Sequence, residues 1–338
     1  MGTLAERRVG TNLPLQGIPL AEHRPVLERL RGAGFTDVWT GEYNRSDAAL
    51  PLALVAGWDE TVNIVSAIIN VATRGPALLA MTAAGLGDLA PGRATVGLGT
   101  SSVVPVAQWN GMSARSPYAR MRETLEFLDD VLSGKRSEGG YSTIRTTGFR
   151  LADPPRQVPR IGIAALGPRM QQLAASHADT LITGFLAASD LDRVWANARL
   201  AERDRSLPFE IMAGVFVLPP MAEAEADTNA RRCIAQYLNT PPYAAQQRWL
   251  GRDAALTPMW ERWGAGDRRG ALAAIPAGLA SELVVRGDPA ECAGRLGAYF
   301  DAGVSSVNLM MAPTVTPVPA QDQVAFLCAI ASELQAIR

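Results

Sequence analysis

Small polar residues follow the apolar runs of this sequence, and they form its most distinctive chemical pattern. They are Asn12, Asn70 and the segments 41–44, 99–102, 164–168 and 183–184. Glu42 is the charged residue among them. A site with so few acids and bases usually leaves the reactive chemistry to a bound cofactor. The pattern therefore predicts an enzyme whose own side chains mainly bind and orient.

The sequence lacks the residues that several other kinds of catalytic or metal site require. The chain has two histidines, His23 and His177, and three widely spaced cysteines, Cys233, Cys292 and Cys328. These numbers exclude a multi-histidine metal site, a zinc cluster and a disulfide framework, so we expect no metal. Neither histidine follows an apolar run, which argues against a Ser/His/Asp set. We expect His23 to be a solvated helix residue and His177 to lie at a helix end.

Composition narrows the range of partners. Apolar residues make up 48% of the 338 residues, charged residues 19%, and the net charge is −1. Without a basic surplus, we expect no nucleic-acid partner. There is no stretch of 18 apolar residues and no apolar segment behind the charged start, which predicts a cytoplasmic protein with no membrane span.

Strand and helix patterns alternate along almost the whole chain. Buried strands are expected at 9–14, 35–40, 62–70, 93–100, 160–166, 179–185, 210–219 and 304–311. Helices are expected at 20–31, 48–57, 76–90, 116–134, 167–178, 191–205, 288–303 and 320–337. Eight strands alternating with helices predict an α/β protein, a (β/α)8 TIM barrel forming one domain over 1–338. A doubly wound sheet is the alternative.

Two insertions interrupt this alternation. Residues 135–158 carry the pattern of a hairpin, and residues 220–285 are helical and irregular. In a TIM barrel the loops after the strands build the site at one end. The barrel would therefore bring the small polar residues together.

Two glycine-containing turns are candidates for binding phosphate. The segment 93–102, RATVGLGTSS, has two of the three glycines of a dinucleotide fingerprint, and the next helix starts too late. The segment 164–170, AALGPRM, takes a strand directly into a helix N-terminus, where free N–H groups favour an anion. The alternative is an ordinary strand–helix turn with a helix-starting proline.

At these turns the sequence resembles the bacterial luciferase-like superfamily, and especially its oxidoreductases that use the deazaflavin coenzyme F420. The resemblance covers most of the chain, in order. It rests on 34–44, 65–102 with its TRGP, LAPGR and GLGTSS blocks, QWNGM at 108–112, 119–134, 158–186 and 286–309. It implies a cofactor site, a homodimer and a small-molecule substrate.

The resemblance also implies roles for individual residues. A bulge, often with a non-prolyl cis peptide, would place Ala67 and Ile68 under the coenzyme ring, with Asn70 nearby. Glu42 would lie near the pyrimidine edge of the ring. The other predicted coenzyme contacts are Thr100, Ser101 and Ser102 beside ring and tail, Ala164, Ala165, Leu166 and Gly167 at the phosphate, and Thr183 toward phosphate or substrate.

The sequence departs from its relatives at two positions. Tyr43 stands where some relatives have a histidine, and Ser102 where some have a carboxylate. We expect Tyr43 and Glu42 to be the catalytic pair, with Tyr43 orienting or protonating the substrate, because a phenol is a poor base at neutral pH. The alternatives are a loop tyrosine packed on Pro51 and a surface ion pair between Glu42 and Arg45.

Aromatic and amide side chains complete the predicted substrate site. We expect Asn12, Tyr43, Trp109 and Trp249 to contact substrate. Tyr243, Trp260 and Trp263 lie in the same insertion as Trp249. These insertion aromatics either line an apolar pocket or fix the helices or a dimer contact.

Three functions remain open. The first is an F420-dependent oxidoreductase that transfers a hydride between the deazaflavin C5 and a small organic substrate. The second is an FMN-dependent monooxygenase of the same fold, using reduced flavin and O₂. The third is a cofactor-binding protein without turnover.

Overall fold

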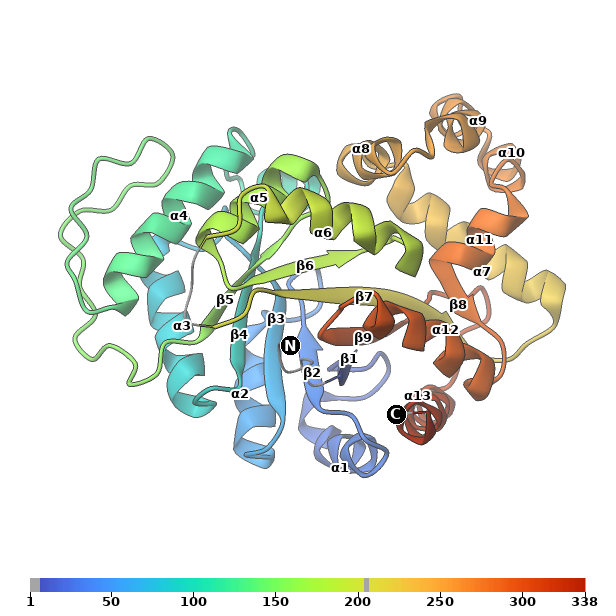
Figure 1. The fold of residues 1–338 in the computed structure, drawn as a ribbon, viewed down its shortest axis with the longest axis horizontal. Helices are drawn as coiled ribbons and strands as arrows, with labels where there is room; N and C mark the ends of the chain where they lie inside the picture. Colours follow the sequence, from blue (N-terminus) through green and yellow to red (C-terminus); the bar gives the residue numbers. More distant parts are fainter. Residues whose placement is uncertain (1–6, 204–206, 338) are drawn as a thin grey trace.

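A closed parallel barrel forms the centre of the molecule (Figure 1). The computed structural model describes residues 7–203 and 207–337. Its strands are β1 (Arg8–Asn12), β2 (Asp37–Thr40), β3 (Asn63–Asn70), β4 (Ala94–Gly99), β5 (Arg160–Ala164), β6 (Thr180–Gly184), β7 (Glu210–Leu218), β8 (Val284–Arg286) and β9 (Ser306–Met311). Strands β1 to β7 pair in sequence order, and β9 pairs with both β7 and β1. Eight strands within the described ranges therefore close the predicted TIM barrel.

Helices surround the barrel, and several begin at a proline, whose fixed backbone angle suits the first helical position. The helices outside the second insertion are α1 (Arg24–Gly32), α2 (Ala49–Trp58), α3 (Pro76–Leu89), α4 (Pro117–Leu132), α5 (Pro168–His177), α6 (Leu191–Arg199), α12 (Pro289–Asp301) and α13 (Ala320–Ala336). Asp288 starts α12 with a capping box, since its carboxylate accepts the N–H of Glu291 at 2.9 Å.

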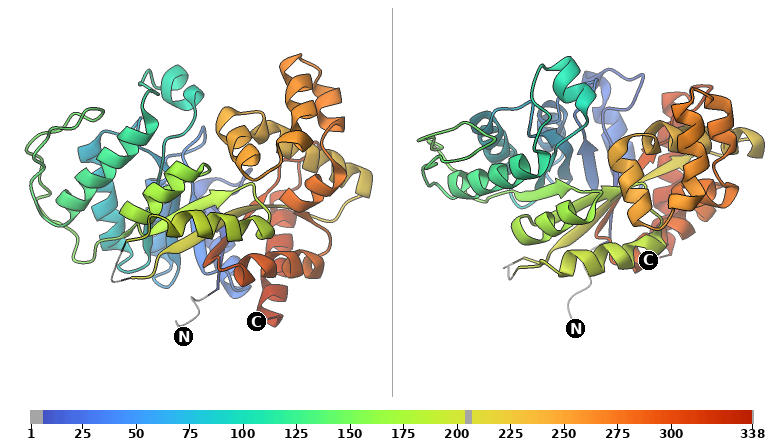
Figure 2. Two further views of the ribbon diagram at one scale, coloured as in Figure 1. Left: turned by 45° about the horizontal axis from the view of Figure 1, so that its top comes forward. Right: turned by 90° about the horizontal axis from the view of Figure 1, so that it is seen from above.

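The second insertion is mostly helical, as expected. It contains α7 (Glu223–Leu238), α8 (Pro241–Trp249), α9 (Asp253–Gly264), α10 (Arg268–Ala273) and α11 (Ala277–Leu283). The short strand β8, which no pattern predicted, follows them and pairs with the end of β7. Figure 2 shows these helices, coloured yellow to orange, on one side of the barrel, with α4 and its following loop on the other.

The barrel interior is a small core of its own. Trp39, Val65, Ile182 and Met212 form it, whereas the main core lies between the strands and the helices. Gly10 makes room for Trp39, because a Cβ at Gly10 would lie 2.7 Å from the indole nitrogen. A side chain at Gly10 would therefore collide with the largest residue of the interior.

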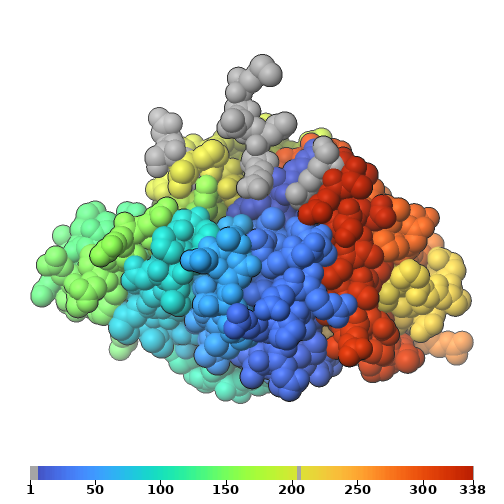
Figure 3. All heavy atoms as spheres, turned by 90° about the horizontal axis from the view of Figure 1, so that it is seen from below, coloured from blue at the N-terminus to red at the C-terminus, as the bar shows by residue number. Residues whose placement is uncertain are grey.

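The first and last described strands meet where the barrel closes. Strand β1 pairs with β9, and α1 packs against α13. Figure 3 shows the described N-terminal segments in blue beside the C-terminal segments in red. In the described part of the chain, no helix has both the length and the apolar character needed to cross a membrane.

Some local predictions were wrong. Residues 135–158 form no strand. Two backbone hydrogen bonds join the two arms of this loop: the Ser137 N–H donates to the Phe149 carbonyl at 2.8 Å, and the Gly148 N–H donates to the Ser137 carbonyl at 2.9 Å. The buried carboxylate of Glu123 on α4 instead holds the loop, accepting bonds from Ser142 and Thr143. The segment therefore packs against a helix, and its internal pairing does not extend into a β-hairpin.

Two further differences concern residues 20–31 and 191–205. His23, expected in solvent, is fully buried: it accepts the Leu15 N–H on Nε2 at 2.8 Å and contacts the Pro19 carbonyl through Nδ1 at 2.9 Å. The imidazole thus anchors the loop after β1. The helix expected to reach residue 205 ends at Arg199, and residues 204–206 lie outside the described ranges.

Candidate functional site

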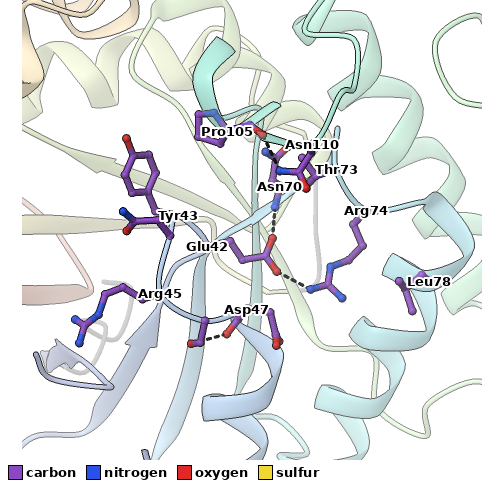
Figure 4. A pocket seen from close by; sticks show the side chains of 12 residues that line it. Glu42, Tyr43, Arg45, Asp47, Asn70, Thr73, Arg74, Leu78, Pro105 and Asn110 are labelled. Atoms are coloured by element: carbon purple, nitrogen blue, oxygen red, sulfur yellow. Dashed lines mark hydrogen bonds and ion pairs between the residues drawn. The ribbon is translucent and has the colours of Figure 1, made fainter. Parts of the chain in front are cut away.

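Glu42 lies at the centre of a polar cluster at the carboxyl end of the barrel (Figure 4). Its Oε1 accepts a bond from Nη2 of Arg74 at 2.6 Å, and its Oε2 accepts the backbone N–H of Asn70 at 3.0 Å. Both charged side chains are 16% exposed. Glu42 is therefore held by Arg74 of the loop after β3, and the surface pair with Arg45 that we considered does not form.

The end of β3 next to Glu42 has an unusual backbone. The peptide between Ala67 and Ile68 is cis, and the register with β4 shifts at this point. The bulge and cis peptide expected at this step are therefore present. Two glycines make room for it: a Cβ at Gly41 would collide with the Ala67 carbonyl oxygen, and one at Gly99 would lie 2.6 Å from Cγ1 of Ile68.

Asn70 fixes the turn that follows β3. Its Oδ1 accepts the N–H of Ala72 at 2.8 Å, and the N–H of Val71 donates to the Gly99 carbonyl at 3.0 Å. Asn70 is 3% exposed, so its side chain serves this turn. The predicted coenzyme residue thus also has a local structural role.

Tyr43 and Trp109 come together, as two residues predicted for the same substrate site should. The rings meet edge to face with centroids 5.1 Å apart. Trp109 ends a π-helical turn, Val104–Trp109, which no sequence pattern predicted. Figure 4 shows the Tyr43 side chain pointing away from the Glu42 carboxylate. The two residues predicted as a catalytic pair therefore face different directions.

A cavity of about 520 Å³ lies beside this cluster. It is lined by Glu42, Tyr43, Asn44, Arg45, Ser46, Asp47, Asn70, Thr73, Arg74, Leu78, Pro105 and Asn110. Most of these residues are polar, and three of them were predicted site residues. The loops after β2 and β3 therefore provide a polar hollow at the expected end of the barrel.

The turn after β5 has the form of an anion cradle. Helix α5 starts at Pro168 without a side-chain cap, and a Cβ at Gly167 would meet no atom within 4 Å. The N–H of Ala165 donates a hydrogen bond to the Ile182 carbonyl at 2.9 Å. Over residues 7–203 and 207–337, no acceptor faces the N–H groups of Leu166 and Gly167. Free N–H groups at a helix N-terminus favour a negatively charged group.

Thr183 adds a second polar feature on the neighbouring strand. Its Oγ1 is buried without a hydrogen-bond partner, and the residue is 5% exposed. Strand β6 pairs directly with β5, with Ala164 opposite Ile182. A buried hydroxyl without a partner is costly, so this group is suited to a ligand or a water molecule.

The predicted residues after β4 form the link to the π-helical turn. Ser101 has a left-handed backbone, with φ of 54°. The Ser102 carbonyl accepts the N–H of Val106 at 3.3 Å, and its side chain is exposed. Thr100 and Ser101 are half-buried at the rim.

Asn12 and Trp249 have very different surroundings. Oδ1 of Asn12 accepts a bond from Nδ2 of Asn308 at 2.9 Å, across the line where the barrel closes. Trp249 instead packs against α6, with the Arg193 guanidinium carbon 5.0 Å from its ring centroid. In the described part of the chain, no hydrogen bond or ring contact joins Trp249 to the other predicted site residues.

A different group of aromatic residues from the second insertion reaches the barrel. Tyr237 and Tyr243 pack with Phe185, which directly follows β6, and Tyr237 also packs with Phe216 of β7. Burial raises the pKa of Tyr243 to about 12. Burial also raises the pKa of Tyr237, with smaller contributions from Cys233, Tyr243 and Tyr43. These phenols therefore stay protonated at neutral pH.

Sequence reasoning missed Arg74, Asn308, Phe185 and Tyr237. A signal existed for Arg74, because it lies in a loop that follows a predicted strand, whereas Phe185 is the last residue of the predicted strand 179–185 and directly follows β6 in the structure. Asn308 sits inside a strand, and Tyr237 lies on an insertion helix. Their positions depend on tertiary contacts that no local pattern reveals.

Comparison with known proteins agrees with the TIM-barrel fold described above. Residues 1–306 match the family model of the luciferase-like monooxygenases. The chain belongs to this family, and it is an enzyme of the oxidoreductase class.

Individual relatives are distant but cover almost the whole chain. A putative coenzyme F420-dependent oxidoreductase of Mycobacterium tuberculosis is 26% identical over 326 residues, covering 89% of this chain and 94% of the relative. The structure of the coenzyme F420-dependent tetrahydromethanopterin reductase from Methanopyrus kandleri aligns with a TM-score of 0.75 and 19% identity, covering 98% and 99%. The oxygenating constituent of 3,6-diketocamphane monooxygenase of Pseudomonas putida, in complex with FMN, aligns with a TM-score of 0.63 and 17% identity, covering 98% of each chain. These structures share the fold.

Proposed function

We propose that this protein is a coenzyme F420-dependent oxidoreductase that transfers a hydride between the deazaflavin C5 and a small organic substrate. The observation that carries the proposal is the cradle after β5. An uncapped α5 N-terminus, open space at Gly167 and the unpartnered hydroxyl of Thr183 together suit a phosphorylated ligand. The relative from Mycobacterium tuberculosis and the reductase from Methanopyrus kandleri, both described as F420-dependent, support the choice of coenzyme.

Different residues of the chain would bind the phosphate and the ring of the coenzyme. The N–H groups of Leu166 and Gly167 would hold the phosphate, with Thr183 beside it. Ala67 and Ile68 would lie under the ring, and Thr100, Ser101 and Ser102 would border it. Coenzyme F420, when bound, supplies a carbon hydride carrier at C5 that reacts little with O₂. The protein would position the substrate against that carbon and exclude water.

Tyr43 would act on the substrate. Its exposed phenol lies on the cavity wall beside Trp109, where it can donate a hydrogen bond or a proton to a substrate oxygen. The amide of Asn12 would provide a further hydrogen bond. We propose these as substrate contacts, whereas the packing of Trp249 against Arg193 gives that residue no evident part.

Reduced FMN with O₂ is the second candidate. The structural neighbour from Pseudomonas putida binds FMN on the same fold. Titration of the purified protein with each coenzyme separates the two candidates. Tight binding of F420 with weak binding of FMN is the expected result. Selective FMN binding, with none for F420, would instead identify a flavin monooxygenase.

We also propose a homodimer that forms through α2 and α3. Helix α2 contains no charged residue, and α3 contains only Asp88. The two helices pack against each other, yet Leu50, Leu78, Met81 and Leu89 on them are 49–54% exposed. Helices that are apolar on all sides are normally covered, and a second copy would bury these side chains.

A further inference from the structure

Both oxygens of the Glu42 carboxylate already accept hydrogen bonds from the protein. Arg74 and the N–H of Asn70 each occupy one oxygen, and the N–H of Ala48 lies 3.5 Å from Oε1. The backbone of Glu42 is also engaged, because its N–H donates to the Ile68 carbonyl at 3.0 Å. Glu42 therefore forms two hydrogen bonds with the end of β3, one from its main chain and one to its side chain. Figure 4 shows the side-chain bond.

Arg74 is anchored on its other side. Its Nη1 lies 3.4 Å from Oγ1 of Thr82 on α3, and that hydroxyl donates to the Leu78 carbonyl at 2.9 Å. A planar guanidinium with two engaged nitrogens has a defined orientation, unlike a flexible ammonium. Arg74 thus links the first turns of α3 to the loop after β2 through Glu42.

We infer that Glu42 and Arg74 form a positioning pair that holds the segment 67–70 in place under the coenzyme ring, instead of contacting the coenzyme or moving a proton. The inference rests on the proposed function, because it concerns the same site. It changes the role expected for Glu42, and it adds Arg74 to the site. Tyr43, whose ring points away from the pair, is left to act on the substrate.

The experiment uses four single variants of the full chain and one double variant. Arg74→Met removes the guanidinium and keeps most of the side-chain stem, Arg74→Lys keeps the charge, and Glu42→Gln keeps the shape of the carboxylate. Arg24→Met is the matched control, since it breaks a similar but exposed ion pair with Glu28 on α1. Two quantities are measured: the dissociation constant of coenzyme F420, and amide hydrogen exchange in the segment 66–75.

The positioning role predicts a linked pattern. Arg74→Met weakens F420 binding about tenfold or more, because a charged hydrogen bond is lost, and the Asn70 and Val71 amides exchange faster. Arg74→Lys recovers most of the affinity. The double variant Arg74→Met/Glu42→Gln binds no more weakly than Arg74→Met alone, because both changes break one interaction. Arg24→Met changes neither quantity.

Two results would overturn the inference. The first is wild-type affinity and exchange in Arg74→Met. The second is loss of F420 binding in Glu42→Gln while Arg74→Met still binds, which would mean direct contact between Glu42 and the coenzyme. If the wild type binds no F420, the proposed function fails, and the exchange data alone then decide whether the pair holds the segment.

Discussion

Tyr43 and Trp109 meet edge to face, with an interplanar angle of 62°. One residue follows β2, and the other ends the π-helical turn after β4. They are 62% and 48% exposed, so the two rings form an aromatic ledge that a bound substrate can still reach. This contact joins the two loops that carry these predicted substrate residues.

Replacing Tyr43 by phenylalanine tests the chemical role of the hydroxyl. The ring contact with Trp109 is kept, so the loop should keep its position. We expect turnover to fall by about a hundredfold, as is common when a general acid is removed, and F420 affinity to stay near the wild-type value. The measurement is the bleaching of coenzyme absorbance with a substrate found by screening small ketones, aldehydes and alcohols. Wild-type turnover would leave the hydroxyl without a role.

A negative charge at Gly167 tests the phosphate cradle. We expect Gly167→Asp to weaken F420 binding by about tenfold or more, because a carboxylate repels the phosphate at close range. Gly167→Ala is the matched control: φ at Gly167 is −94°, and its Cβ would enter open space. Equal affinities for the aspartate variant and the wild type, measured by fluorescence titration, would remove the phosphate from this turn.

Glu123 makes the stability of the protein depend on pH. Burial alone would raise the pKa of its carboxyl, but hydrogen bonds from the hydroxyl and N–H groups of Ser142 and Thr143 lower the pKa from 4.5 to about 2. A lowered folded-state pKa stabilises the protein above the unfolded value, and the stabilisation is lost as pH falls from about 4.5 toward 2. The shift corresponds to at most about 3 kcal/mol.

Denaturant unfolding of Glu123→Gln checks this effect. We expect a free energy of unfolding about 1–3 kcal/mol below that of the wild type at pH 7, from lost charged hydrogen bonds. The difference should shrink as the pH is lowered below 4.5. A difference that is the same at pH 7 and pH 4 would mean that the glutamine disturbs packing and not charge.

A charge on α3 tests the homodimer. The wild type should have twice the chain mass of 36.0 kDa in sedimentation analysis. Met81→Glu should reduce it to a single chain, because a buried unpaired charge opposes association. Leu200→Glu, at a more exposed leucine just after α6, is the control and should leave the dimer intact. A wild-type protein that sediments as one chain would contradict the proposal.

The barrel could be predicted because each strand is a short apolar run buried on both faces. The run 62–70 and the strand Asn63–Asn70 show how close such predictions come. The same approach gave a wrong prediction for the segment 135–158. Its β-favouring residues suggested a hairpin, but Glu123, which lies 19 residues before Ser142, captures the loop. Such a contact belongs to tertiary packing, which local propensity does not describe.

The sequence predicted which loops build the candidate site. It did not predict which side chains contact each other there. The rule that loops after barrel strands build the site selected Glu42, Tyr43 and Asn70. It could not reveal that Arg74, 32 residues after Glu42, holds the carboxylate. It also could not bring Asn308 to Asn12, 296 residues away, because that pair exists only once the barrel closes.

The central claim concerns the position of the coenzyme, and a crystal structure with bound F420 tests it most directly. We predict the phosphate at the α5 N-terminus, within hydrogen-bond distance of the Gly167 N–H, and the ring against Ala67 and Ile68. The Glu42 carboxylate should remain on Arg74, and Tyr43 should face the substrate side. A phosphate bound elsewhere, with the turn after β5 empty, would contradict the account.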